Sequence, residues 1–306
     1  QSLRHLISQV VDAVTPQTIL VVLSQVPPGF TRGLCGHIPA LADGGKFQLF
    51  CQVETLVIGD AVQRAVNPER NIVGRRDDQI GLPDLYRRLL GAFDAPVFLM
   101  GYESAELTKA SINMFLASTV STSNTLAEVC EAIGADWSEI VPALKSDRRI
   151  GQYAYLQPGL GLSGGNIERD MAAIQGIASE FGTDAGVVDA WFSNSRHRLD
   201  WVLNTLHSQV MSKTDNPRIG VWGLAYKANT NSIKNSPAIG LLEDLGPAEI
   251  TVYDPQITLD KVCFPNVRQA SSAMDAAKDA DALVVTAPWA EFSGIDLAPV
   301  RESMRG

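Results

Sequence analysis

No apolar run in this 306-residue sequence is long enough to form a membrane-spanning helix. Dense clusters of Lys and Arg are absent too, and 25 basic residues against 34 acidic ones give a formal net charge of −9. Nucleic acids and anionic membrane surfaces attract clustered positive charge. We therefore expect neither nucleic acid nor a membrane as a partner.

Cysteine is scarce, with only Cys35, Cys51, Cys130 and Cys263 present. No two of them have the Cys-x-x-Cys spacing of zinc or redox sites, so no metal site is expected. Nothing at the amino end has the pattern of a signal peptide. Together these absences predict reduced thiols and a cytoplasmic protein.

The longest regular pattern is Glu103 to Ile133, which contains neither Gly nor Pro and repeats apolar residues at helical spacing. It predicts one helix of about 45 Å, at 1.5 Å per residue. The small hydroxyl residues from Ser118 to Thr125 would permit another helix to approach closely. Lys109 and Asn113, four residues apart, share a face of this helix. They point either into a cleft or, as most such pairs do, into solvent.

Alternating strand and helix patterns flank this helix. Apolar runs predict strands at 18–23, 71–74, 96–100, 218–222, 250–253 and 282–286, and helices are predicted at 3–14, 84–93, 168–180, 186–211 and 236–245. We expect an α/β fold with two Rossmann-like parallel-sheet units, the first incomplete, joined by a central helical domain. The expected domains are 1–98, 99–212 and 213–306.

Five glycines fall between Gly151 and Gly165. Glycine lets a backbone adopt positive φ and approach a ligand closely, although a flexible surface loop has the same composition. The turn after the first strand, Ser24 to Gly29, lies where doubly wound sheets place ligands. A Gly-x-Gly-x-x-Gly dinucleotide fingerprint is lacking, since Gly220-x-x-Gly223 is too short.

Several motifs together resemble a known family. They are SQVPPGFTR, NPERNIVG, AELTKASINMFLA, DRRIG, YLQPGLGLSGGNIERD, GVWGLAYKANTNSIKNSPA and DADALVVTAPWAEF. Their order resembles the nucleotide-sugar dehydrogenases, the UDP-glucose and GDP-mannose 6-dehydrogenase group. The resemblance implies NAD as cofactor, a nucleotide-sugar substrate, and a homodimer built on the long helix. It also implies that the start of the amino-terminal Rossmann domain, with its Gly-x-Gly-x-x-Gly turn, is lacking here.

In that family, carbon 6 of the sugar gives two hydrides in succession to NAD, and a cysteine thiolate forms a thioester between the two oxidations. By resemblance, Lys109 would stabilise the oxyanion, Asn113 would help to orient it, and Asp170 would position or deprotonate water. Glu54 matches the Glu of a family motif. The position of the family's cysteine is Asn166.

The remaining site residues also come from the resemblance. Those expected at the substrate are Arg149, Tyr155, Leu156, Gly159, Gly161, Tyr226 and Lys227, with Arg149 reaching the substrate of a partner subunit. Those expected at the cofactor are Ser24, Gln25, Arg169 and Lys234. Gln25 replaces a family Thr, and Lys234 replaces an Arg. We expect Lys109, Asn113, Asp170 and the loop Gly159 to Gly165 to converge in one pocket.

Asparagine cannot form a thioester, which leaves two hypotheses open. The protein is either an oxidoreductase that stops after one hydride or reaches the acid through an aldehyde hydrate, or a catalytically silent protein that binds nucleotide sugars or other partners. Retention of Lys109, Asn113 and Asp170 favours the first hypothesis.

Overall fold

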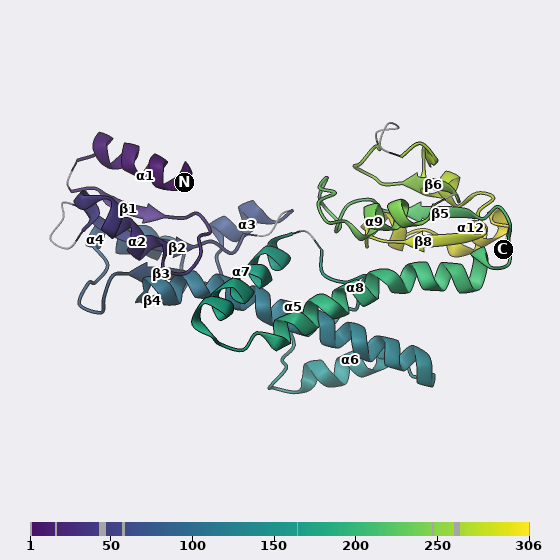
Figure 1. The fold of residues 1–306 in the computed structure, drawn as a ribbon, viewed down its shortest axis with the longest axis horizontal. Coiled ribbons are helices and arrows are strands. Elements are labelled where there is room, and N and C mark those ends of the chain that lie inside the picture. Colours follow the sequence, from purple (N-terminus) through teal and green to yellow (C-terminus); the bar gives the residue numbers. More distant parts are fainter. Residues whose placement is uncertain are drawn as a thin grey trace. The chain divides into compact units, whose positions relative to one another are not determined.

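The computed structural model describes residues 2–15, 17–42, 47–56, 59–163, 165–246, 248–259 and 264–305, so Gly164 and Cys263 lie outside it. The chain divides into two compact units, residues 1–112 and 113–306 (Figure 1). The mixture of α-helices with largely parallel sheets confirms the predicted fold class. The three domain boundaries stay a prediction.

The first unit contains a four-stranded sheet in the order β1-β2-β3-β4. Its strands are β1 (Ile19–Val22), β2 (Gln48–Val53), β3 (Asn71–Arg75) and β4 (Val97–Gly101). Its helices are α1 (Ser2–Ala13), α2 (Phe30–His37), α3 (Ala61–Val66) and α4 (Asp84–Gly91), with a 3-10 turn at Pro39–Leu41. Separate apolar clusters form around Leu34 and Tyr102 and around Phe50 and Tyr86.

This sheet differs from the prediction in three respects. Strand β3 runs antiparallel to β2, so the sheet is mixed and not purely parallel. Strand β2 was not predicted. Strand β4 was predicted to be buried, but it lies at the edge of the sheet, and Val97 and Phe98 are exposed. An edge strand has a neighbour on one side only, so part of its apolar surface stays accessible.

Helix α5 (Tyr102–Ile133) confirms the predicted long helix as one uninterrupted element of 32 residues. It begins in the first unit and continues into the second. In the second unit its small residues are buried, including Ala117, Ser121 and Ser123. Ala117 and Val120 pack in a cluster with Met171 and Val188 from the two following long helices. Tertiary packing therefore holds a segment whose hydroxyl residues have indifferent helix propensity.

The second unit continues with α6 (Trp137–Ser146), α7 (Asn166–Phe181), α8 (Gly186–Leu206) and a π-helical turn (His207–Met211). A sheet follows in the order β7-β6-β5-β8, and all its pairs are parallel. Its strands are β5 (Arg218–Trp222), β6 (Glu249–Tyr253), β7 (Val267–Gln269) and β8 (Ala282–Val285). The helices α9 (Pro237–Asp244), α10 (Ala273–Ala277), α11 (Ala290–Ser293) and α12 (Leu297–Ser303) accompany it. The largest apolar cluster of the protein lies around Val221 and Trp222.

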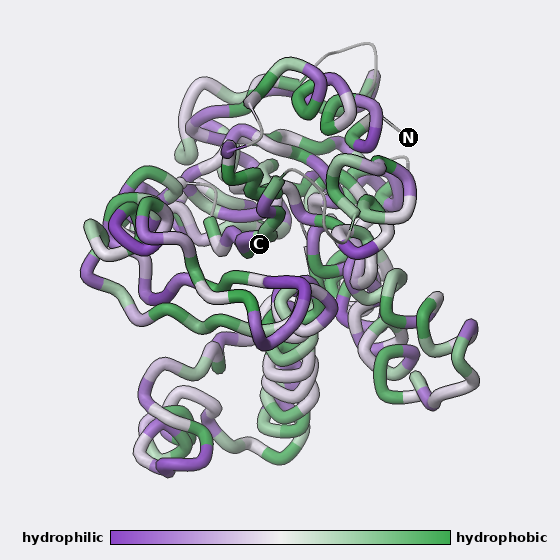
Figure 2. Tube along the Cα trace, turned by 90° about the vertical axis from the view of Figure 1, so that its left-hand side faces the viewer, coloured by the Kyte–Doolittle hydropathy of each residue, from purple (hydrophilic) through white to green (hydrophobic). Residues whose placement is uncertain are grey.

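Hydropathy changes over short stretches along the chain, as the colouring of the tube in Figure 2 shows. Within the residues that the structure describes, no helix combines the length and apolarity needed to cross a membrane.

Candidate functional site

A cleft in the first unit lies at the carboxyl ends of β1 and β2. It is lined by Val22, Leu23, Ser24, Gln25, Val26, Cys51, Gln52, Val53, Glu54, Glu106 and Lys109. Four of the predicted site residues, Ser24, Gln25, Glu54 and Lys109, are thus brought together. The cleft occupies the position that open α/β sheets commonly use for ligands.

Glu106 of α5 shapes one side of this cleft. Its carboxylate is buried and accepts hydrogen bonds from the backbone N–H groups of Gly29 (2.6 Å) and Thr31 (2.8 Å). Gly29 precedes α2 with φ of 87° and offers no side-chain cap of its own. A carboxylate from α5 therefore caps α2, where the helix dipole favours negative charge. This contact anchors the Pro-Pro-Gly turn next to the cleft.

Cys51 is the only cysteine that lines the described cleft, and its side chain is buried. Burial and the nearby carboxylate of Glu106 raise the pKa of this thiol to about 11. Because a thiolate is the reactive form, Cys51 is a poor nucleophile near neutral pH.

In the second unit, Asn113 and Asp170 form a buried pair. The side-chain amide of Asn113 donates to Oδ2 of Asp170 at 2.6 Å, and each residue is about 5% exposed (6% and 4%). Arg169 lies 3.4 Å from the other carboxylate oxygen of Asp170. The structure thus brings together two predicted catalytic residues that are 57 positions apart in the sequence. Lys109 lies one turn before Asn113 on the continuous helix α5.

Asn166 is the first residue of α7 and is exposed. Gly165 precedes it with φ of 78°, a conformation that glycine adopts without strain. The side chain of Lys234 lies close to Gly165, because a Cβ built on this glycine would be 3.0 Å from Cε of Lys234. Asn235 hydrogen-bonds to Glu168 in the first turn of α7. The segment around Lys234 therefore lies at the amino end of α7, near Asn166 and Arg169.

The loop between α6 and α7 is fixed by side chains from three helices. Trp137 of α6 donates from its indole to the Leu156 carbonyl (2.9 Å), and Asn124 of α5 accepts from the Gly159 N–H (2.7 Å). From α8, Arg198 donates to the Gly159 carbonyl (3.3 Å) and Ser195 accepts from the Leu162 N–H (2.8 Å). These contacts exclude the alternative that this part of the glycine-rich segment is an unsupported surface loop.

Gly161 has a particular steric role in the same loop. Its φ is +91°, and a Cβ at this position would lie 2.7 Å from the backbone carbonyl oxygen of Ser195. By contrast, a Cβ on Gly159 would meet nothing within 4 Å. Only glycine at position 161 lets the loop pack directly against the backbone of α8.

Tyr226 and Lys227 follow β5 and lie next to this loop. The hydroxyl of Ser163 donates to the Tyr226 carbonyl at 3.3 Å. The Lys227 ammonium lies 5.7 Å from the centre of the Tyr226 ring, and burial raises the pKa of Tyr226. The loop and these two predicted substrate-binding residues are therefore neighbours. Tyr155 is exposed, whereas Leu156 is buried and contributes its carbonyl to the Trp137 contact.

Arg149 is 89% exposed and turned back onto Asp147, with Nη2 2.6 Å from Oδ2. The hydrogen bond lowers the pKa of Asp147 and raises the pKa of Arg149. A role of Arg149 at a partner's substrate would require it to leave this contact. That role stays a prediction.

Asp254 connects the loops at the carboxyl ends of three strands. It is 5% exposed, and its carboxylate accepts from five donors, which are the backbone N–H groups of Leu224, Ala225, Gln256 and Ile257 and the indole of Trp289. These donors follow β5, β6 and β8. In a parallel sheet this edge is the expected ligand edge.

Sequence reasoning missed several residues that shape these sites, which are Glu106, Asn124, Trp137, Ser195, Arg198 and Asp254. Each contacts at least one group that is 19 or more positions away, and all but Asp254 lack a recognisable local pattern. For Asp254 a signal was present, because an Asp-Pro pair directly after a predicted strand marks a turn at the ligand edge.

Two family profiles match the chain: the central domain of the UDP-glucose/GDP-mannose dehydrogenase family over 103–195 and its UDP-binding domain over 220–306. Together they cover more than half of the sequence. The chain belongs to the UDP-glucose/GDP-mannose dehydrogenase family.

Relatives and solved structures agree with this assignment. UDP-glucose 6-dehydrogenase AglM of Haloferax volcanii is 33% identical over 91% of this chain, which spans 66% of that protein. TuaD, a UDP-glucose 6-dehydrogenase of Bacillus subtilis, is 30% identical over 94% of this chain, which spans 62% of that protein.

Two solved structures share the fold. A UDP-glucose dehydrogenase from Pyrobaculum islandicum has a TM-score of 0.85 at 24% identity, over 99% of this chain and 72% of that one. A UDP-D-ManNAc dehydrogenase from Pyrococcus horikoshii has a TM-score of 0.83 at 22% identity, over 100% and 71%. At such identities the likeness establishes the architecture.

Proposed function

We propose that this protein takes part in the NAD-dependent oxidation of a nucleotide sugar at carbon 6, by a route that does not use a cysteine thioester. Family membership supports a nucleotide-sugar dehydrogenase. The buried hydrogen bond between Asn113 and Asp170 is the observation that carries the proposal, because a binding protein without catalysis has no evident need for this pair.

In the proposed reaction, a water held by Asp170 takes the proton of the sugar hydroxyl, and the ammonium of Lys109 stabilises the alkoxide that forms. Asn113 orients the same oxygen. Asp170, fixed by Asn113, positions water or accepts a proton from it. Glu54, which lines the same cleft as Lys109, is proposed to act on the reacting sugar as well.

Some of the described residues have side chains that suit the binding of NAD. Ser24 and Gln25 line the cleft after β1, whose turn Glu106 anchors, and these are groups suited to the reacting end of a dinucleotide. In the second unit, Arg169 and Lys234 lie near the amino end of α7, where a helix dipole favours phosphate. Bound NAD would supply the hydride acceptor. A glycine turn for its pyrophosphate is not present in this sequence.

Asn166 limits the chemistry. A carboxamide is a very poor nucleophile, so the proposed product is the aldehyde, formed with one NADH, or an acid, formed when water adds to the aldehyde and the hydrate gives a second hydride to a second NAD. The second candidate function, a catalytically silent nucleotide-sugar binding protein, is favoured by the same asparagine. Tyr226, Lys227 and the glycine loop would serve binding in either case.

The test is a count of NADH formed per nucleotide sugar consumed, with UDP-glucose as the first substrate and mass spectrometry of the trapped protein. One NADH with an aldehyde product supports the truncated oxidation. No NADH together with binding of the sugar nucleotide supports the silent protein. Two NADH and an acid without an adduct support the route through the aldehyde hydrate, whereas two NADH with a covalent acyl adduct would mean that another side chain acts as nucleophile.

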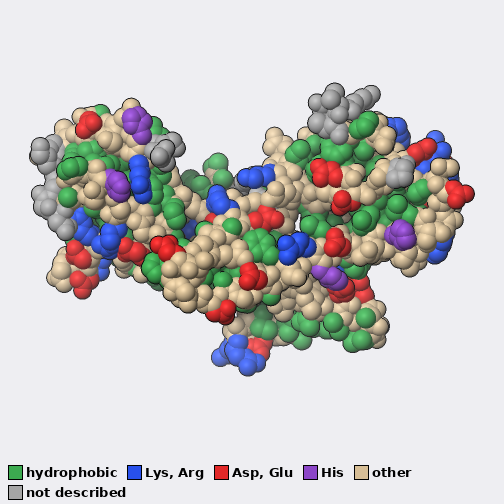
Figure 3. Space-filling view, viewed as in Figure 1, with side chains coloured by type: hydrophobic (Ala, Val, Ile, Leu, Met, Phe, Trp, Pro, Cys, Tyr) green, Lys and Arg blue, Asp and Glu red, His purple; other side chains and the backbone are tan. Residues whose placement is uncertain are grey.

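We also propose a homodimer that uses α5 and α6 of the second unit. Helix α6 has no buried residue, and Phe115 and Ile133 of α5 are 77% and 72% exposed. Hydrophobic side chains are visible along the edge formed by α6 in Figure 3. Analytical ultracentrifugation should give a dimer that Phe115→Asp weakens. Phe181→Asp, at an equally exposed position on α7, is the control and should leave the dimer intact.

A further inference from the structure

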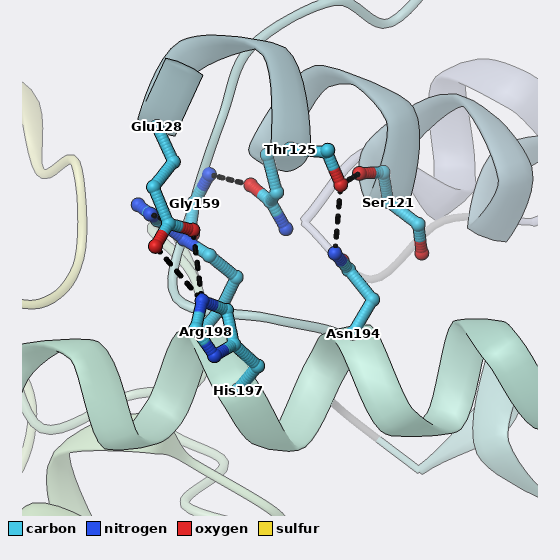
Figure 4. A network of polar contacts seen from close by, with 8 residues as sticks. Ser121, Thr125, Glu128, Gly159, Asn194, His197 and Arg198 are labelled. Atoms are coloured by element: carbon cyan, nitrogen blue, oxygen red, sulfur yellow. Dashed lines mark hydrogen bonds and ion pairs between the residues drawn. The ribbon is translucent and has the colours of Figure 1, made fainter. Parts of the chain in front are cut away.

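Arg198 of α8 is a buried charged residue outside every motif that the proposed function uses. Its side chain is 5% exposed, whereas the neighbouring His197 is 59% exposed. A buried guanidinium is costly unless its charge and its donors are satisfied. Among the described residues, Arg198 contacts the Gly159 carbonyl and, at 3.5 Å, the Glu128 carboxylate, all three of which are labelled in Figure 4. It also lies 4.7 Å from the centre of the Trp201 ring.

Arg198 and Asn124 together satisfy the hydrogen-bonding groups of the Gly159 backbone. Gly159 is exposed, so water could bond both polar groups of its backbone. Instead, Asn124 accepts from its N–H and Arg198 donates to its carbonyl. Both residues are buried, at 1% and 4% exposure of the whole residue, and Nδ2 of Asn124 finds no hydrogen-bond partner among the described residues.

Burial of a charge and of an unsatisfied amide is unfavourable. The gain is that the two consecutive peptide groups that flank Cα of Gly159 are held from two helices at once. Both polar groups of Gly159 are fixed in direction, two residues before the glycine that packs directly on α8. The arrangement specifies the geometry of an exposed backbone, which is what a ligand-contacting loop needs.

We infer that Arg198 is a positioning residue: it orients the peptide group after Gly159 while Asn124 orients the one before it, and together they present the loop backbone to the nucleotide sugar. The effect on binding of the nucleotide sugar rests on the proposed function. The ordering of the loop by Arg198 does not depend on it. Glu128 and Trp201 hold the guanidinium in place, and the guanidinium in turn fixes the direction of the Gly159 carbonyl.

Hydrogen exchange with mass spectrometry on the full chain tests the loop directly. Arg198→Met removes the donor and keeps an apolar stem of similar reach. We expect amides in 156–163 to exchange at least tenfold faster, with unchanged exchange in β5 and β6. Arg198→Lys retains a cationic donor and should restore part of the protection.

The matched control is Asn194→Ala. Asn194 also joins α8 to α5, through Thr125 Oγ1 at 2.9 Å (Figure 4), and among the described residues no hydrogen bond joins it to the loop. Loop exchange should stay at the wild-type rate in this variant. If Arg198→Met leaves the loop amides unchanged, or accelerates exchange equally throughout the second unit, the inference is wrong. Should Arg198→Met fail to fold, Asn124→Ala is used under the same criteria.

Calorimetry with UDP-glucose tests binding of the sugar nucleotide separately from the role of Arg198 in the loop. If the wild-type protein binds UDP-glucose, Arg198→Met should bind it at least tenfold more weakly, and equal affinity would overturn the positioning role. If the wild-type protein does not bind it, the proposed function is contradicted for this sugar. The exchange experiment then still decides whether Arg198 orders the loop.

Discussion

Asn113 and Asp170 are joined by a 2.6 Å hydrogen bond from amide to carboxylate, in a site where both side chains are buried. The bond fixes which oxygen of Asp170 is occupied and keeps the Asn113 amide pointing toward it. Because Asn113 donates and Asp170 accepts, two substitutions can distinguish the effect of this bond on stability from its effect on activity.

Asp170→Asn retains an oxygen that can accept from Asn113, so we expect the free energy of unfolding to change by less than ~1 kcal/mol. Activity with a nucleotide sugar should nevertheless fall by about 10²-fold or more, because an amide cannot act as a base. Denaturant unfolding and NADH formation measure the two effects. Equal activity in the variant would remove Asp170 from the mechanism.

Asn113→Asp places a second carboxylate beside Asp170, and the pair should hold one proton with a raised pKa. A raised pKa in the folded state means that the folded protein binds more protons than the unfolded one, so stability rises as pH falls. We expect a loss of Tm at pH 7 that is partly recovered near pH 5. A uniform loss across this range would contradict the pairing.

Asn166→Cys should create a reactive thiol. The side chain is exposed at the first position of α7, where the helix dipole lowers the pKa of a thiol. We expect this cysteine to react with iodoacetamide at pH 7 well before Cys51, whose pKa is about 11. Peptide mass spectrometry measures both rates. If the variant also gives two NADH per sugar, Asn166 is established as the position that stops the reaction.

Gly161→Ala should destabilise the loop more than Gly159→Ala does. The first substitution forces a Cβ to within 2.7 Å of a backbone oxygen at positive φ, and the second meets open space. We expect losses of about 1–3 kcal/mol for position 161 and about 0.5 kcal/mol or less for position 159. Urea unfolding of the two variants provides the comparison, and similar values would exclude a steric role for Gly161.

Acid should weaken the contact between Glu128 and α8. The hydrogen bond with His197 is the main cause that lowers the pKa of Glu128, and Arg198 adds to it. A folded-state pKa below the unfolded value of about 4.3 gives stability above that pH, which is lost as pH falls through the folded pKa. Tm measured from pH 6 to pH 3 should fall less steeply in Glu128→Gln. His197→Ala should flatten the same region, and the double variant should add little.

NAD should bind weakly to the chain of 306 residues. Rossmann folds hold the pyrophosphate with a glycine turn and the helix behind it, and this sequence has no such turn. We expect a Kd above about 100 μM by calorimetry, since the contacts from Ser24, Arg169 and Lys234 are peripheral. A Kd in the low micromolar range would mean that another segment forms the pyrophosphate site.

The sequence predicted α5, the strand β5 and the helix with Pro237 in its first turn, because each has an uninterrupted periodic pattern. Strand β2 was missed because its apolar run, Leu49 to Cys51, is only three residues long and lies between Gln48 and Gln52. The antiparallel direction of β3 has no sequence signal at all. Residues such as Arg198 and Asn124 were not predicted, because a side chain that acts on a backbone group over 30 positions away leaves no local spacing.

The single carboxylate of Asp254 holds backbone from two of the loops that end strands and an indole from a third. Such sharing ties the opening of these loops together, since releasing one leaves the buried charge short of donors. The ligand edge of the second sheet should therefore open as one cooperative unit, and its amides should share a single opening free energy in native-state exchange. A nucleotide bound by any one loop would then slow the opening of all three.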